Sequence, residues 1–166
     1  MGHGSALYVP PRTGGWDREF PTFTPAQLFL LVSDIEKYPL FIPGCIATRI
    51  LDRGEGHWRV DNLFTFGPVR SRFTTYAEFE APRWLDVTSR DGPWSSLRLA
   101  WRFSPGSSGG CRVSCRFAAQ FRSRLLSALA SVGLAEAERL FIRGFESRAH
   151  SLYGSPRSGA PVLAPR

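Results

Sequence analysis

The sequence predicts an α+β domain in which one long, curved antiparallel sheet wraps around a long C-terminal helix, with two short helices after the first strand. Six consecutive segments between residues 45 and 121 show the two-residue alternation of strands. The turns between them contain glycine or proline and are too short to hold a helix, so neighbouring strands should run antiparallel. A helical pattern over Ser123–Tyr153 is the one segment long enough to cover the apolar face of such a sheet.

Composition indicates a single globular domain. The 166 residues are 43% hydrophobic and 21% charged, which suffices for one proper core. No apolar run approaches the roughly 20 residues that span a bilayer, and the first residues lack the apolar core of a signal peptide. Three cysteines without an obvious pairing do not suggest a disulfide framework. We therefore expect a cytoplasmic protein, with disordered tails at 1–15 and 154–166 around a domain at 16–153.

The chain enters its first helix through a short strand, Trp16–Phe23. Thr24-Pro25-Ala26-Gln27 is a capping box, with Thr24 as N-cap, proline at N1 and glutamine at N3. Phe23 and Leu28 stand at the two positions of a hydrophobic staple. These signals predict a helix that begins at Pro25.

A proline corner, Tyr38–Cys45, follows a second predicted capping box at Ser33–Glu36 that restarts the helix at a new angle. Because proline lacks an N–H and restricts the residue before it, the corner should not continue as a helix. It belongs either to the core or to the mouth of a cavity. We expect Phe41 to point inward as part of a cavity wall, with Leu40 or Ile42 near the surface where a ligand enters.

The predicted strands share turn signals and alternation. They are Cys45–Asp52, His57–Phe66, Val69–Phe79, Trp84–Arg90, Leu97–Phe103 and Cys111–Phe121. In the last two strands the apolar residues all fall on one face and arginines on the other, so one face should be buried and the other exposed to water.

The C-terminal helix contains two glycines, Gly133 and Gly144, each of which costs about 1 kcal/mol relative to alanine in a helix interior. A close approach or a bend is the expected reason for them. The helix also carries small residues in its first half and large ones in its second, which leaves room under the first half. A sheet wrapped on this helix is a helix-grip arrangement, and we expect a hollow between the two.

The candidate cavity residues are the corner residues and the large apolar side chains of the inner face. They are Tyr38, Phe41, Pro43, Cys45, Leu63, Phe73, Trp101, Phe103, Phe117, Phe141 and Phe145. Such a set is ordinarily core, but with small residues opposite it can line an apolar ligand cavity.

The opposite face of the sheet should be basic. Between residues 69 and 124 there are ten arginines and four acidic residues, so this segment holds most of the net charge of +7. The predicted basic face comprises Arg70, Arg72, Arg98, Arg102, Arg112 and Arg116. It is either an ordinary solvated face or one that attracts phosphate, in ribosomal RNA or in anionic lipid head groups. Aromatic residues are sparse on it, with Tyr76 as the main one, so base stacking on single strands is not indicated, and no DNA partner is expected.

Catalytic and metal sites find little support in the sequence. His3, His57 and His150 have no patterned carboxylate or nucleophile nearby. Cys111 and Cys115 would lie roughly 13 Å apart along a strand, too far for a disulfide, and they lack the further ligands that zinc needs. An enzyme of the polyketide cyclase type is disfavoured because no polar residues converge on the inner face. We therefore expect no enzyme, no metal and no catalytic cofactor.

The corner Tyr38-Pro39-Leu40-Phe41-Ile42-Pro43-Gly44-Cys45 resembles the Y-P-x-F-[LIV]-P-[GW]-C segment of the coenzyme Q-binding START-like proteins, whose bacterial relatives include ribosome association toxins. Further matching segments follow in the same order and extend the likeness over about residues 18–154. They are Asp91-Gly92-Pro93-Trp94, Leu97, Trp101-Arg102-Phe103, Cys111-Arg112-Val113, Phe145-Glu146-Ser147-Arg148-Ala149 and Leu152-Tyr153-Gly154.

The resemblance implies a START-like helix-grip fold with a hydrophobic cavity that can hold a polyprenyl quinone, and no catalytic chemistry. Gly44 stands where mitochondrial quinone-binding members tend to have tryptophan, which favours the bacterial branch. Two functional hypotheses follow. One is non-enzymatic binding of ubiquinone or another isoprenoid lipid, with peripheral contact at the inner membrane. The other is binding to the large ribosomal subunit through the basic face, which would block subunit association.

Overall fold

The computed structural model describes residues 8–154, which form a seven-stranded sheet and four helical segments. The strands are β1 Arg12–Phe20, β2 Cys45–Gly54, β3 His57–Phe66, β4 Val69–Glu80, β5 Trp84–Ser89, β6 Trp94–Pro105 and β7 Cys111–Phe121. The helices are α1 Pro25–Ser33, the 3₁₀-helix η1 Ile35–Leu40, α2 Arg124–Ser131 and α3 Leu134–Tyr153. The predicted bounds of β3 and β7 are confirmed to the residue.

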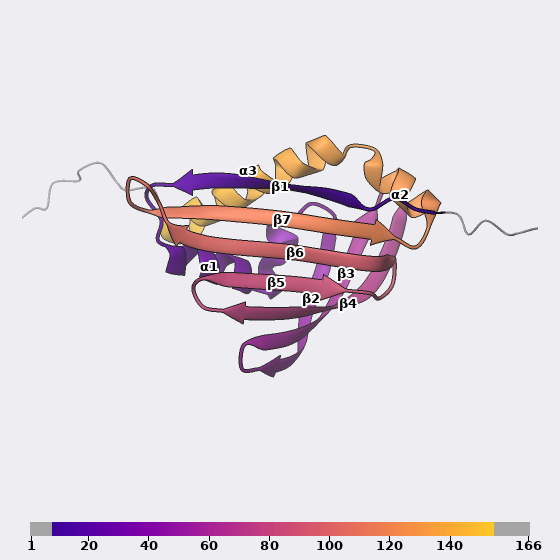
Figure 1. Cartoon of the computed structure of the whole chain (residues 1–166), viewed down its shortest axis with the longest axis horizontal. Coiled ribbons are helices and arrows are strands. Elements are labelled where there is room, and N and C mark those ends of the chain that lie inside the picture. The colour runs from indigo at the N-terminus through magenta and orange to yellow at the C-terminus, as the bar shows by residue number, and fades with distance from the viewer. Residues whose placement is uncertain (1–7, 155–166) are drawn as a thin grey trace, which may run out of the picture.

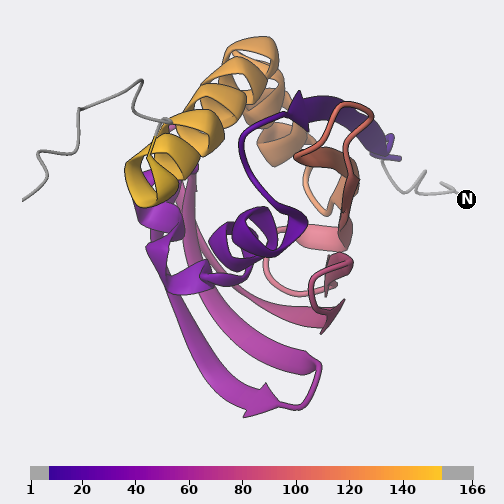
Figure 2. The ribbon, with the colours of Figure 1, turned by 90° about the vertical axis from the view of Figure 1, so that its left-hand side faces the viewer.

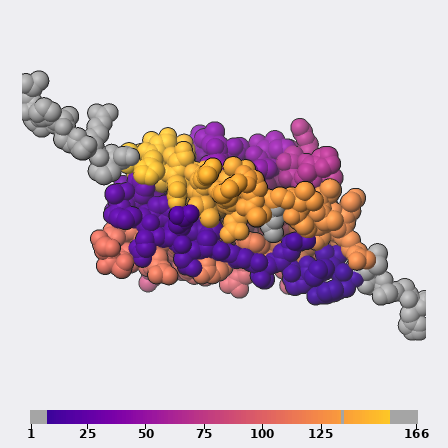
Figure 3. Space-filling model, turned by 90° about the horizontal axis from the view of Figure 1, so that it is seen from above, coloured from indigo at the N-terminus to yellow at the C-terminus, as the bar shows by residue number. Residues whose placement is uncertain are grey.

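The sheet has the order β1-β7-β6-β5-β4-β3-β2, with every neighbouring pair antiparallel (Figure 1). Viewed along the strands, it bends into a U that holds α1 inside, while α3 lies across the open side (Figure 2). On the face seen in Figure 3, α2 and α3 lie beside β1. The predicted helix-grip fold is therefore confirmed.

Strand β1 begins earlier than the sequence predicts, because Arg12–Gly15 belong to the sheet and not to a tail. These residues pair with β7 from Arg12 opposite Ala119 onward. Gly14 and Gly15 hide the strand from pattern analysis because they supply no alternating side chains. They also let β1 approach closely, since a Cβ on Gly14 would lie 2.6 Å from a ring carbon of Phe117. The rest of the predicted tails, residues 1–7 and 155–166, lies outside the described residues.

The predicted start of α1 is confirmed, whereas the second capping box is wrong. Gln27 N donates to Thr24 Oγ1 at 3.2 Å, and Thr24 N donates to Gln27 Oε1 at 2.9 Å. At η1 the N-cap is Asp34, whose side chain makes no capping bond. Glu36 instead accepts a hydrogen bond from the backbone of Ile50 in β2.

The proline corner is also more helical than predicted, since η1 runs through Pro39 to Leu40. A 3₁₀-helix this short makes few internal hydrogen bonds, and the φ of proline suits it. The chain leaves η1 with Phe41 N and Ile42 N both donating to Tyr38 O, at 3.1 and 2.8 Å. The stiff corner is therefore confined to residues 41–44.

The predicted single C-terminal helix is two helices, and the two glycines have different reasons. Gly133 has a φ of 79° and separates α2 from α3, so it provides the bend. Gly144 provides the close approach, because a Cβ there would lie 2.4 Å from the backbone oxygen of Phe41. Nowhere in residues 8–154 is there a helix with both the length and the apolarity that crossing a bilayer demands.

Candidate ligand cavity under the C-terminal helices

A cavity of about 490 Å³ lies between the inner face of the sheet and the segment formed by α2 and the first half of α3. Its walls come from β1, the corner after η1, strands β3 to β7, and the helices. The helical side contributes small residues, including Ala130, Gly133 and Ala137, so the two layers do not fill the space between them. The cavity thus lies under the first half of the C-terminal helical segment, where the sequence has small residues.

Five of the residues proposed from the sequence line this cavity. They are Tyr38, Pro43, Phe73, Phe117 and Phe141. Tyr38 closes one end, with its hydroxyl donating to Val32 O at 2.5 Å, and burial raises the pKa of that hydroxyl. Its polar atom is therefore satisfied by α1, and the tyrosine presents ring surface to the hollow.

Four others, Cys45, Trp101, Phe103 and Phe145, lie in the packed core instead of on the wall. Trp101 and Phe103 occupy the half of β6 that α1 and the second half of α3 cover. Phe29 packs edge-on against Phe103 at 5.7 Å, and Phe145 stacks on Trp101 at the same centroid distance. The other half of β6, with Leu97 and Leu99, forms the wall.

Phe41 and Leu63 also lie off the wall, contrary to prediction. Phe41 packs edge-on against Tyr38 at 5.5 Å, and its backbone meets Gly144 of α3. Leu40 is 66% exposed, and Ile42 takes the wall position expected of Phe41. Leu63 is on the outer face opposite Arg72, because the strand alternates and its neighbour Asn62 faces inward.

Sequence reasoning missed two buried polar residues on the wall, Asn62 of β3 and Thr75 of β4. They are 6% and 5% exposed. Asn62 Nδ2 donates to Val60 O and Phe73 O, both at 3.2 Å, and to Thr75 Oγ1 at 3.0 Å. The sequence does contain a signal for both residues, because each is a polar residue at an inward position of its strand, between apolar residues.

A third missed wall residue, Arg12 of β1, ties the sheet to α2. Its Nη2 donates to Ser127 O at 3.2 Å, to Ser127 Oγ at 3.4 Å, and to Ser131 Oγ. Its Nε is buried and has no hydrogen-bond acceptor among the described residues. Arg12 fell in the segment that the sequence predicted to be a tail, which is why it was missed.

The three cysteines are free and buried. Burial raises the pKa of Cys115, which lines the cavity, to about 12, and does the same for Cys45. The pKa of Cys111 rises to about 11, again through burial. At neutral pH all three thiols are protonated, the form that is a poor nucleophile and a poor metal ligand.

The predicted basic face is exposed on the outer side of the sheet, but acidic residues neutralise much of it. Arg102 and Arg98 both pair with Asp86, at 2.5 and 3.5 Å. The other pairs join neighbouring strands: Arg116 with Asp17 at 2.5 Å, Arg72 with Asp61 at 3.8 Å, and Arg112 with Glu19 at 3.9 Å. The hydrogen bond from Arg116 lowers the pKa of Asp17.

Of the six predicted arginines, only Arg70 lacks an ion-pair partner among residues 8–154. The charge count along the sequence missed this neutralisation because Asp17, Glu19 and Asp61 lie outside the segment that was counted. The geometry of the face is that of an ordinary solvated sheet surface.

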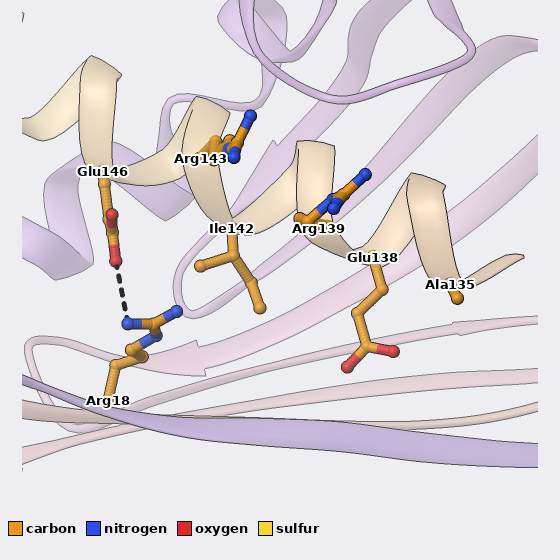
Figure 4. A pocket seen from close by; sticks show the side chains of 7 residues that line it. All are labelled: Arg18, Ala135, Glu138, Arg139, Ile142, Arg143 and Glu146. Carbon is orange, nitrogen blue, oxygen red and sulfur yellow. Dashed lines mark ion pairs between the residues drawn. The ribbon is translucent and has the colours of Figure 1, made fainter.

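A second, shallower groove lies between β1 and α3 (Figure 4). Glu138, Ile142 and Glu146 project from α3 towards β1, where Arg18 pairs with Glu146 at 3.5 Å. Arg139 pairs with Glu136 on its own helix. Arg18, Glu146 and Arg139 of the groove are thus ion-paired, and Glu138 also borders the cavity.

The remaining titratable residues among positions 8–154 do not form a reactive cluster. His57 Nδ1 lies 3.0 Å from the backbone oxygen of Glu55 in a turn, and His150 packs edge-on against Phe23 at 5.1 Å. Within the described part of the chain no three histidine, cysteine or acidic side chains are grouped as metal ligands would be.

Comparison with known proteins finds relatives of two kinds. The chain is 28% identical over 133 residues to the ribosome association toxin RatA of Vibrio cholerae, which covers 80% of this chain and 92% of that protein. It is 30% identical over 146 residues to the mitochondrial coenzyme Q-binding protein COQ10 homolog B of Xenopus laevis. That match covers 86% of this chain and 59% of the longer relative.

Solved structures agree on the fold. The 18 kDa protein CC1736 of Caulobacter crescentus is 28% identical, with a TM-score of 0.67 over 87% of this chain and 99% of that one. The Zhui aromatase/cyclase from a Streptomyces species has a TM-score of 0.68 over 85% of this chain and 94% of that one, at 11% identity. At that identity the second likeness concerns the fold alone, so an enzyme's activity does not carry over to this chain.

The family described as polyketide cyclase / dehydrase and lipid transport matches residues 22–146. That span runs from the capping box of α1 to the second half of α3 and contains all the strands except β1. Both the cavity and the helices that cover it fall largely within the match. The chain therefore belongs to the polyketide cyclase / dehydrase and lipid transport family, and its fold is START-like.

Proposed function

We propose that this protein binds ubiquinone or a related polyprenyl lipid in the cavity without transforming it, and so supports quinone function in respiratory electron transport. The observation that carries the proposal is the hollow of about 490 Å³ walled mainly by apolar side chains. The similarity to a protein named for coenzyme Q binding supports the choice of ligand. We place the protein in the cytoplasm, in peripheral contact with the inner membrane.

The cavity suits the ring and the first part of the tail of such a lipid. Ligand pockets typically measure about 300–1,000 Å³, and this one lies in the lower half of that range. Apolar surface that leaves water for the cavity gains roughly 25 cal/mol per Å². A long tail would extend out of the hollow towards the membrane.

Apart from Glu138, an exposed carboxylate at the border of the cavity, the chemistry of the wall supports binding without catalysis. Cys115 is held protonated by burial, and neither His57 nor His150 lines the cavity. The wall polar groups Asn62 and Thr75 are hydrogen-bonded to each other, and neither is a general base at neutral pH. Orientation of a bound molecule is the task that these groups can perform.

Native mass spectrometry of the full chain, purified from a quinone-producing host, tests the proposal. We expect a co-purified isoprenoid lipid that organic extraction identifies, and saturable uptake of a short-chain ubiquinone by the stripped protein. Absence of bound lipid together with absence of uptake would reject the proposal.

A second candidate function is binding to the large ribosomal subunit. The similarity to a ribosome association toxin over 92% of that protein's length favours it. The basic face would supply the contact with RNA phosphate, which is sensitive to salt. The ion pairs on that face weaken the case for ribosome binding, because an arginine that is paired with a carboxylate attracts RNA phosphate less strongly.

Co-sedimentation with ribosomal subunits at low and high salt tests the second function. Replacing Arg98, Arg102, Arg112 and Arg116 with glutamate should abolish salt-sensitive co-sedimentation. The matched control makes the same charge change on the helices, at Arg124, Arg139, Arg143 and Arg148. Loss in both variants would indicate a general charge effect, and retention in the first would remove the basis for this function.

A further inference from the structure

The amide of Asn62 has a fixed orientation. Its Nδ2 is surrounded by Val60 O, Phe73 O and Thr75 Oγ1, at 3.0–3.2 Å. Two of these three atoms are backbone carbonyl oxygens, which can only accept hydrogen bonds. The group that faces them must be the NH₂ of the amide, since a flipped amide would set three oxygens against one another.

This orientation leaves Asn62 Oδ1 as the atom that the amide presents to the cavity. Asn62 is 6% exposed, and no donor among residues 8–154 is bonded to this oxygen. Its neighbour Thr75 Oγ1 accepts from Asn62, so the threonine keeps its own hydrogen to donate. The wall thus presents an acceptor and a donor side by side within an apolar hollow.

We infer that this pair selects a ligand carrying a hydroxyl, and that the cavity prefers a hydroquinone to the corresponding quinone. The inference rests on the proposed function and names the redox state of its ligand. A hydroxyl can donate to Asn62 Oδ1 while accepting from Thr75 Oγ1. A carbonyl can only accept, so it leaves Asn62 Oδ1 buried without a donor and faces it with a second set of lone pairs.

The preference should be measurable because a buried acceptor without a partner is costly. From the usual cost of such a group we expect the hydroquinone to bind at least about fivefold more tightly than the quinone. The protein transfers no electrons in this scheme. Reduction of the free quinone, which takes up two electrons and two protons, is done with a chemical reductant before binding.

The experiment compares decylubiquinone with its hydroquinone, each titrated into the full chain under anaerobic conditions by equilibrium dialysis. A second readout is the midpoint potential of the bound couple. Tighter binding of the reduced form raises that potential by about 30 mV for each tenfold preference. The two readouts must agree, which guards against slow oxidation during dialysis.

Three variants sharpen the test. Asn62→Leu removes the acceptor and should reduce the preference to within about twofold. Thr65→Val is the matched control, because Thr65 also borders the cavity but its hydroxyl donates to Gly44 O at 3.5 Å, and this variant should keep the preference. Thr75→Val removes the one hydrogen bond that the quinone makes, so it should keep or widen the preference even if Asn62→Leu folds poorly.

The outcomes separate the two proposals. If neither form binds, the proposed function fails. If both bind with equal affinity, or if Asn62→Leu folds and keeps the full preference, the function stands and the inference on redox state is overturned.

Discussion

Cys115 lines the cavity and is 3% exposed, and burial raises the pKa of its thiol to about 12. In the unfolded chain a thiol titrates near its ordinary value of about 9. Between these values the unfolded state loses its proton while the folded state keeps it, so stability falls as the pH rises. Below about pH 9 both states are protonated and the contribution is constant.

We therefore predict that Cys115→Val flattens the loss of stability at alkaline pH. Each thiol held protonated contributes a slope of up to about 1.4 kcal/mol per pH unit between pH 9 and 12. Denaturant titrations at pH 7, 9, 10 and 11 measure the free energy of unfolding for both proteins. The variant's stability relative to wild type should rise with pH; parallel profiles would show that burial does not protect this thiol.

Gly144 provides a second prediction at the scale of one residue. A methyl group at this position meets the backbone oxygen of Phe41 at 2.4 Å, and a backbone atom cannot move aside as a flexible side chain can. Although alanine favours helix by about 1 kcal/mol over glycine, we expect Gly144→Ala to destabilise the protein by about 1–3 kcal/mol. The measurement is the free energy of unfolding.

The control for Gly144→Ala is Ser147→Ala, on an exposed position of the same helix. That change should stay within about 0.5 kcal/mol of wild type. Stabilisation by Gly144→Ala would mean that α3 and the corner at Phe41 do not touch.

At the scale of the element, α2 depends on Arg12 for its position. The helix has eight residues, and Leu125 and the following Val132 are exposed, so apolar burial alone holds it weakly. The hydrogen bonds from Arg12 to Ser127 and Ser131 join it to β1. Since α2 covers part of the cavity, its mobility should govern how fast a ligand leaves.

We predict that Arg12→Met speeds amide hydrogen exchange in α2 at least about tenfold while exchange in α3 stays unchanged, as expected for local opening. Mass spectrometry of peptides spanning residues 124–131 and 134–153 measures both. Arg18→Met is the matched control, because Arg18 lies on the same strand but pairs with Glu146 of α3. Equal protection of α2 in wild type and Arg12→Met would show that another contact holds this helix.

An element can be predicted from the sequence when its side chains show the period of a strand or a helix. β3 was predicted to the residue because Gly56 and Gly67 mark its two ends, and β7 because its inward apolar residues alternate with outward polar ones. β1 was predicted to begin four residues too late because Gly14 and Gly15 carry no side chain to alternate, and to end three residues beyond Phe20. The break between α2 and α3 could not be predicted without knowing the φ of Gly133. A glycine within a helical pattern indicates either a bend or a close contact, and the sequence does not distinguish the two.

At the scale of the whole molecule, the presence of a hollow was predictable and most of its wall was not. Small residues on one half of the C-terminal segment indicate where space remains. The curvature of the sheet decides which aromatic residues border that space, and it placed Trp101, Phe103 and Phe145 in the core. The ion pairs of the basic face escaped prediction for a related reason, since Asp17 and Arg116 are neighbours only once β1 joins β7.

The hollow should lower the stability of the protein as a whole, because it leaves apolar wall surface unpacked. Ala137 lines the cavity from the first turn of α3, so Ala137→Phe should place a ring in the open space. Burying that ring should stabilise the free protein by about 1 kcal/mol, given roughly 25 cal/mol per Å² of apolar surface. The same ring should weaken binding of decylubiquinone more than about tenfold, because ligand and ring compete for one volume. Ser147→Phe, on the exposed side of the same helix, is the control and should leave both quantities unchanged. Stability and affinity that move in opposite directions would show that the hollow is kept for a ligand; a stabilised variant that binds as well as wild type would place the ligand elsewhere.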